Sequence, residues 1–262
     1  MKKRIAWLIL ALCMVLMCGL VAGCSNSVDT DVNKAIENTK NLNSIDAAMD
    51  MEMDMSANGV KISIPMSIGI KANGLNGKNP EVISSISVIM SGQSMDMEMY
   101  QKGDWLYMLA GGNGYKTSLD STEMDYYYTE HISDMLQEIP KSLLSDALVK
   151  DGEGTSKITE VTVDGELFAE MYDDFSEYVV EAAGVVDPQV KISGANVKIT
   201  TDGGYVTAYD MQFTMELTVD SESAQTDVSA SVKYNAPGKK VKITAIEGYK
   251  DFEEIDTSGS GE

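Results

Sequence analysis

Met49-Asp50-Met51-Glu52-Met53-Asp54-Met55 is the stretch that decides the fold, because an apolar side chain and a carboxylate alternate in it without a break. Successive side chains of a β-strand point to opposite faces of the sheet, so residues two apart share a face. The alternation therefore predicts a strand over residues 45–57, with methionines on one face and carboxylates on the other.

The same period of two continues on the C-terminal side. Asn58-Gly59 is typical of a hairpin turn, and the strand after it places apolar side chains at Ile62, Ile64, Met66, Ile68 and Ile70. Pro65 lacks a backbone donor, which indicates a sheet edge or a bulge at that position. Further alternating stretches between residues 82 and 119 include Met95, Met97 and Met99. These patterns predict antiparallel hairpins with one apolar face and one wet face.

Helical spacing interrupts the strands at three places. Residues 28–42 carry apolar side chains at three- and four-residue intervals, residues 132–148 hold two short apolar stripes, and a longer helix is expected after Asp164. Strands are expected over 157–163 and then over 189–200, 205–219, 225–235 and 240–246. We therefore expect one α+β domain over residues 28–250, with about 11 strands and the helices on the apolar face of the sheet. Residues 251–262 are expected to form a disordered acidic tail.

The N-terminus has the three parts of an export signal. Lys2, Lys3 and Arg4 precede an apolar run, which ends in Val21-Ala22-Gly23-Cys24. This box resembles the bacterial lipoprotein signal, which implies that residues 1–23 are removed, that Cys24 is acylated and that residues 24–31 form a lipidated tether. The alternative is an uncleaved anchor helix over residues 5–22. Either interpretation predicts a protein at the cell membrane that faces outside the cytoplasm.

The composition excludes several classes of function. The whole chain has a net charge of −21, and removal of the signal leaves 17 basic against 41 acidic residues, a net charge of −24. Nucleic acid is therefore not an expected partner. The other two cysteines leave with the signal, and His131 is the one histidine, so no thiol or imidazole constellation for catalysis is available. We expect no enzyme, no cofactor and no metal site, and protein partners cannot be named.

Three groups of residues resemble the LolA/LppX-like family of bacterial lipid and lipoprotein carriers. They are the alternating strands from Met49, the run from Met99 to Met108, which contains Lys102-Gly103-Asp104, and the run from Tyr234 to Ile243, which contains Pro237-Gly238. The resemblance implies a curved half-barrel wrapped around helices on its concave face, with an apolar cavity between them. The candidate residues for lining this cavity are Met51, Met53, Ile64, Met66, Met97, Met99, Trp105, Tyr107, Phe168 and Met171.

The methionine stripes allow three interpretations. They are core residues chosen for flexible packing, or the lining of a cavity that accepts varied apolar shapes, or soft ligands for copper(I) in a Met-x-Met spacing. The function expected from the sequence is a membrane-anchored lipoprotein that binds a lipid or another apolar ligand. The alternative is a surface structural or protein-interaction lipoprotein with a filled core and no small ligand.

Overall fold

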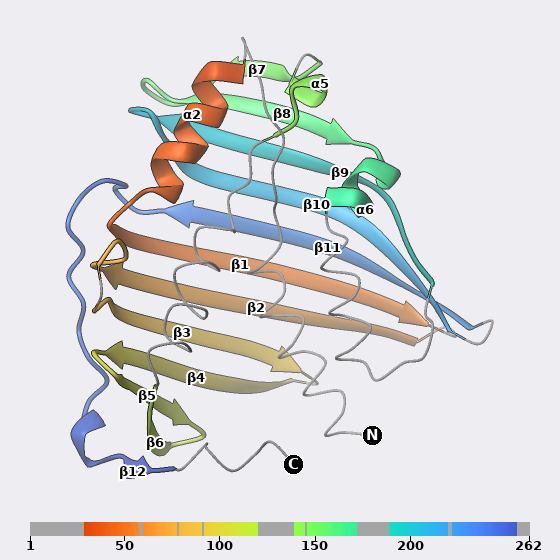
Figure 1. Ribbon diagram of the computed structural model, residues 1–262. Coiled ribbons are helices and arrows are strands. Elements are labelled where there is room, and N and C mark those ends of the chain that lie inside the picture. Colours follow the sequence, from red (N-terminus) through yellow and green to blue (C-terminus); the bar gives the residue numbers. More distant parts are fainter. Residues whose placement is uncertain are drawn as a thin grey trace.

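A computed structural model describes residues 29–57, 60–77, 79–90, 92–119, 139–144, 146–171, 189–219 and 222–255. Twelve strands of this part of the chain form one large, open, curved sheet (Figure 1), in the order β12-β6-β5-β4-β3-β2-β1-β11-β10-β9-β8-β7. Every neighbouring pair is antiparallel except β12 and β6. The predicted α+β architecture with an extensive antiparallel sheet is confirmed.

The first half of the chain supplies one helix and six strands. Their bounds are α2 Asp29–Lys40, β1 Ser44–Ala57, β2 Val60–Asn73, β3 Glu81–Met90, β4 Gln93–Lys102, β5 Trp105–Ala110 and β6 Asn113–Ser118. The second half supplies the rest. These elements are α5 Lys141–Leu144, β7 Leu148–Asp151, β8 Lys157–Val163, α6 Gly165–Met171, β9 Gln189–Asp202, β10 Tyr205–Val219, β11 Glu222–Tyr234, the 3₁₀-helix η1 Tyr249–Asp251 and β12 Glu253–Glu254.

The sheet consists of two meanders joined at its centre. Strands β1 to β6 follow one another outward, strands β7 to β11 return inward, and β1 pairs with β11 from Ala47↔Tyr234 to Ala57↔Ala224. The strand predicted from the Met-Asp alternation is therefore the strand that connects the two halves. Pro65 lies where the pairing of β2 with β3 stops, because the last paired residue is Met66. At Pro65, β2 therefore has no neighbour on its β3 side, as predicted for a sheet edge. From Met66 onward, β2 lies between β1 and β3.

The helices lie against the half of the sheet formed by β8 to β10 (Figure 1). Helix α2 buries Val32, Ala35 and Ile36, and it is fixed by Thr39, whose hydroxyl accepts a bond from the Val206 amide at 2.9 Å. The predicted cap of the helix after residue 164 is confirmed, since the Asp164 carboxylate accepts bonds from the amides of Glu166 and Leu167 at 2.9 and 3.0 Å. Capping bonds of this kind stabilise a helix start by about 1 kcal/mol.

Residues 235–255, which we call the strap, replace the expected strand over 240–246. The strap runs along the ends of β1 to β5 and adds β12 beside β6 (Figure 1). The prediction of a strand was wrong because no neighbouring strand pairs with the backbone of this segment, although Val241 and Ile243 alternate with polar residues as in a strand. The tail was expected to be disordered from Asp251, which is also wrong up to Ile255, since the Ile255 amide donates to the Lys116 carbonyl at 2.9 Å.

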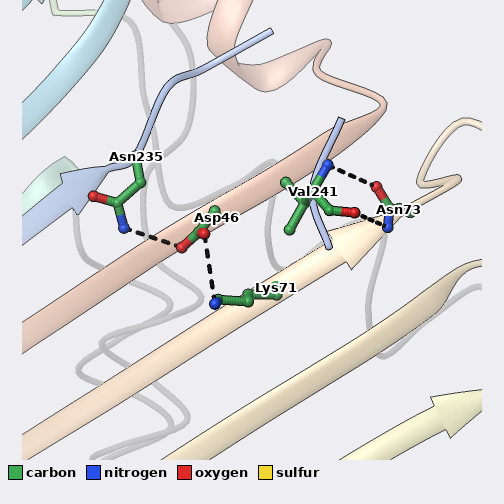
Figure 2. Close-up of polar contacts among 5 residues, drawn as sticks. All are labelled: Asp46, Lys71, Asn73, Asn235 and Val241. Carbon is green, nitrogen blue, oxygen red and sulfur yellow. Dashed lines mark hydrogen bonds and ion pairs between the residues drawn. The ribbon is translucent and has the colours of Figure 1, made fainter. Parts of the chain in front are cut away.

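Side chains hold the strap in place of a ladder. The Asn73 amide donates to the Val241 carbonyl at 2.8 Å, and its oxygen accepts from the Val241 amide at 3.3 Å (Figure 2). The Asn235 side chain donates to the Asp46 carboxylate at 3.0 Å, and Lys71 forms an ion pair with the same carboxylate at 3.7 Å (Figure 2). The start of the strap is therefore tied to both β1 and β2.

Several sequence-based predictions lie outside the described residues. They are the signal and tether with Cys24, the Asn58-Gly59 turn, His131, the apolar stripe over 132–138, the continuation of the helix beyond Met171 and the tail over 256–262.

Candidate functional site

The candidate site is the face of the sheet that carries Met49, Met51 and Met53, which we call the inner face. Strand register places its side chains in rows that cross the whole sheet. One row consists of Val161, Val197, Met211, Ala230, Met51, Met66, Val88 and Met95. The next row consists of Ile199, Tyr209, Val232, Met49, Ile68, Ile86, Met97 and Ala110. The inner face is thus one continuous apolar surface from β8 to β5.

Seven of the ten predicted lining residues belong to this surface or pack on it. Met51, Met53, Ile64 and Met66 are buried, and Met53 has 0% of its surface exposed. Met97 and Met99 are half-buried against the same core. Phe168 of α6 is buried with its ring centroid 5.1 Å from that of Phe213 on β10. Met171 ends α6, but its side chain lies outside the described residues.

Trp105 and Tyr107 are separated from the others by the register of β5. Tyr107 lies opposite Tyr100, and Trp105 lies opposite Lys102, so both point to the face opposite Met97 and Met99. Leu106 and Met108 occupy the inner face instead, since Met108 lies opposite Met99. Strand β5 is apolar at nearly every position, so its sequence contains no alternation that could assign its faces.

The inner face reaches solvent at one end of the sheet. Met55, Ile62 and Met95, which we call the rim, are 36%, 45% and 43% exposed. Met55 and Ile62 form the row beyond Met53 and Ile64, near the β1–β2 connection. Exposed large apolar side chains that continue a buried apolar surface often mark a binding site. The rim is therefore an accessible border of the inner face.

One polar group on the inner face has no partner among the described residues. The Ser84 hydroxyl is buried between the apolar rows, opposite Ile70 on β2 and Met99 on β4, and it makes no hydrogen bond. A buried hydroxyl without a partner costs about 1–3 kcal/mol. It is a point where a hydrogen-bonding group of a ligand would gain binding energy.

The opposite, outer face carries Asp50, Glu52 and Asp54 and is polar. Two adjoining hollows of about 1010 and 670 Å³ lie on it. Both include the cross-strand row Glu52, Ser229, Gln212, Asn196 and Thr162. Hydroxyl groups already bind several of the outer-face carboxylates, as Ser231 does for Asp210 at 2.7 Å. The smaller hollow is mainly polar, whereas the larger one is also lined by Pro65, Leu143 and Leu148 and so combines polar and apolar walls.

An aromatic cluster on the outer face fastens the far end of the strap. The Tyr249 ring lies edge-on to those of Tyr100 and Tyr107, with centroids 5.1 and 4.7 Å apart. The Tyr100 hydroxyl donates to Glu81 at 2.6 Å. This bond, together with Lys102, holds the pKa of Glu81 below its ordinary value although partial burial opposes the shift. Burial first, and then Glu81, raise the pKa of Tyr100, so the phenol remains a donor.

The described residues contain neither a group of metal-binding side chains nor a membrane-spanning helix. Among the described residues between 29 and 255, no three His, Cys, Asp or Glu side chains lie close enough together to hold a metal ion. No helix in that part of the chain combines the length and the apolar character needed to cross a bilayer.

A family model matches residues 27–245, which is most of the chain and includes every strand from β1 to β11. The chain belongs to DUF6612, a family of unknown function. No curated protein matches this member of DUF6612.

The chain is similar to several solved structures at low sequence identity. LprF from Mycobacterium bovis is 11% identical, with 86% of this chain and 99% of that chain covered and a TM-score of 0.45. A DUF1329 family protein from Desulfovibrio piger is 9% identical, with coverages of 81% and 95% and a TM-score of 0.26. A LolA superfamily protein from Nitrosomonas europaea is 8% identical, with coverages of 84% and 96% and a TM-score of 0.23. These likenesses concern the fold and carry no ligand over to this chain.

Proposed function

We propose that this DUF6612 protein is a membrane-anchored, extracytoplasmic lipoprotein that binds a lipid or another apolar ligand on the inner face of its sheet. The observation that carries the proposal is the rim, because Met55, Ile62 and Met95 extend the apolar rows of the core to solvent. Exposed apolar side chains that continue an apolar core are typical of sites that bind apolar groups.

The composition of the inner face supports a ligand of variable shape. The methionines of the core and its border are Met49, Met51, Met53, Met66, Met90, Met97, Met99, Met211 and Met215. Unbranched thioether side chains adapt to irregular apolar surfaces better than β-branched ones do. The unpartnered Ser84 hydroxyl suits a ligand that combines an apolar chain with a hydrogen-bonding group, as a fatty acid or a phospholipid does.

The anchoring half of the proposal rests on the sequence. Cys24 follows small residues at the end of an apolar run, and α2 begins only a few residues later at Asp29. Two acyl chains on Cys24 hold a protein stably at a bilayer. The folded domain would then be kept close to the outer surface of that membrane.

Native mass spectrometry with lipid extraction tests the proposal on the mature chain produced with and without acylation. We expect a reproducible apolar molecule to accompany the wild type, and we expect Ile62→Glu combined with Met95→Glu to lose most of it. Both side chains are more than one third exposed, so the double variant is expected to fold. Ile89→Glu is the matched control, since Ile89 is 43% exposed at the same end of the sheet but lies on the outer face.

A second candidate function follows from the two outer-face hollows, in which hydroxyl, amide and carboxylate side chains lie beside a few apolar ones such as Leu143 and Leu148. They favour a surface protein that binds a polar partner while its core is filled. A mature chain that carries no lipid, takes up none from added fatty acids and phospholipids, and behaves like its rim variant would support this second function and contradict the first.

A further inference from the structure

Basic side chains gather in one short segment of this acidic protein. Residues 233–242, which we call the lysine segment, contain Lys233, Lys239, Lys240 and Lys242 and no acidic residue. All four lysines are exposed. None of them forms an ion pair with another described residue. The chain as a whole has 20 basic residues against 41 acidic ones, so this uncompensated positive charge stands out.

Three acidic groups at this end of the sheet already have partners. Asp46 binds Lys71 and Asn235. Glu81 binds Lys102 and Tyr100. Asp202, at the end of β9, accepts a bond from Thr155 at 2.6 Å. The lysine segment therefore presents its charge outward at the end of the sheet where β1 begins.

The backbone holds the lysine segment in one conformation. Asn73 binds both polar backbone groups of Val241 (Figure 2). The Lys239 amide closes a turn onto the Ala236 carbonyl at 3.2 Å, through Pro237 and Gly238. Ala236 has a φ of 48°, the sole positive value at a non-glycine residue in the described ranges. Such a conformation costs free energy and is often found at functional sites.

We propose that the lysine segment docks this end of the sheet onto the anionic phospholipid headgroups of the membrane that anchors the protein. Each lysine beside an anionic bilayer strengthens binding roughly five-fold. The partner is a membrane surface, because the proposed anchoring keeps the domain against one. The inference rests on the proposed anchoring only for the choice of this surface.

Chain length permits the contact. Five residue steps separate Cys24 from Asp29 at the start of α2, and an extended chain covers at most about 3.6 Å per step, or roughly 18 Å. The end of helix α2 lies beside the same edge of the sheet, since Asn38 donates to the Gly204 carbonyl at 2.8 Å, and the Tyr205 ring lies beside Gly238 of the lysine segment. The start of this 12-residue helix lies about 17 Å from its end at 1.5 Å per residue. An extended tether is about as long as the helix, so it can bring Cys24 level with the lysine segment. The rim lies at the other end of β1, about 30 Å away at 3.3 Å per residue. Docking by the lysines would therefore turn the rim away from the anchoring membrane.

Lysine acetylation footprinting tests the proposal on the full acylated protein. The protein is reconstituted into vesicles of phosphatidylcholine alone, or of phosphatidylcholine with about one third phosphatidylglycerol. We expect Lys239, Lys240 and Lys242 to be protected several-fold in the anionic vesicles and not in the neutral ones. Lys61 and Lys191 at the opposite end of the sheet, both exposed, should react equally in both. High salt should remove the protection.

Vesicle flotation separates failure of the anchor from failure of the docking. Protein that floats with both vesicle types but shows equal acetylation of the lysine segment overturns the docking proposal while leaving the anchor intact. Protein that floats only with anionic vesicles, and loses this in Lys239→Glu/Lys240→Glu but not in Lys61→Glu/Lys191→Glu, supports docking without the anchor. Flotation with neither vesicle type overturns both. Protection by soluble polyphosphate but not by phosphatidylglycerol would also overturn the membrane as the partner.

Discussion

At the scale of single residues, asparagine side chains hold segments of backbone that have no regular pairing. Asn73 binds Val241 through both ends of its amide, and Asn33 binds Ile139 in the same way, at 3.2 and 3.1 Å. Tyr100 plays a comparable role for the strap, because its ring packs on Tyr249 while its hydroxyl binds Glu81. No sequence pattern marks such residues in advance, since their partners lie far away along the chain.

The Tyr100–Glu81 bond predicts a pH dependence of stability. The pKa of Glu81 is lower in the folded protein than its ordinary value of 4.5, chiefly because Tyr100 donates to the carboxylate. The stabilisation is therefore present above that value and is lost as the pH falls through the lower, folded pKa. We expect Tyr100→Phe to reduce the difference in unfolding free energy between about pH 5 and pH 3, as measured by urea denaturation. If the Tyr100→Phe variant loses as much unfolding free energy between these two pH values as the wild type does, this role for the bond is contradicted.

At the scale of elements, the sequence was most informative where a strand has one wet face. The Met-Asp alternation of β1 predicts its bounds and faces correctly, and β9 to β11 also appear where expected. The prediction from the sequence was wrong for residues 240–246. Their apolar residues alternate as in a strand, but the backbone at Val241 is bound by the Asn73 side chain and pairs with no neighbouring strand. It also placed Trp105 and Tyr107 on the inner face, because β5 has apolar residues on both faces. Strands β7 and β12 are too short to show a period.

The strap predicts a local effect of Asn73→Ala. Loss of two neutral hydrogen bonds should cost about 1–2 kcal/mol of unfolding free energy, mainly by freeing residues 236–246. Hydrogen exchange at the Val241 amide should become much faster, while exchange at the centre of β1 changes little. Asn41→Ala is a control, since its side chain bonds only within the end of α2, to the Glu37 carbonyl. Equal acceleration in both variants would mean that Asn73 does not hold the strap.

At the scale of the whole molecule, one sheet separates two kinds of chemistry. The inner face is apolar and rich in methionine, the outer face carries carboxylates and hydroxyl groups, and β1 contributes to both. The two ends of the sheet also differ, since the rim lies at one end and the lysine segment at the other. In the proposed account an apolar ligand enters past the rim onto the inner face, while the lysine end faces the anchoring membrane.

Photo-crosslinking with a diazirine-bearing fatty acid or phospholipid, followed by peptide mapping, tests the central claim most directly. The account predicts adducts on inner-face residues of β1 to β4, among them Met97, Met99 and rim residues such as Ile62, that unlabelled lipid competes away. Adducts confined to the outer-face row around Gln212, or an absence of competable labelling on a folded protein, would contradict an apolar ligand site on the inner face.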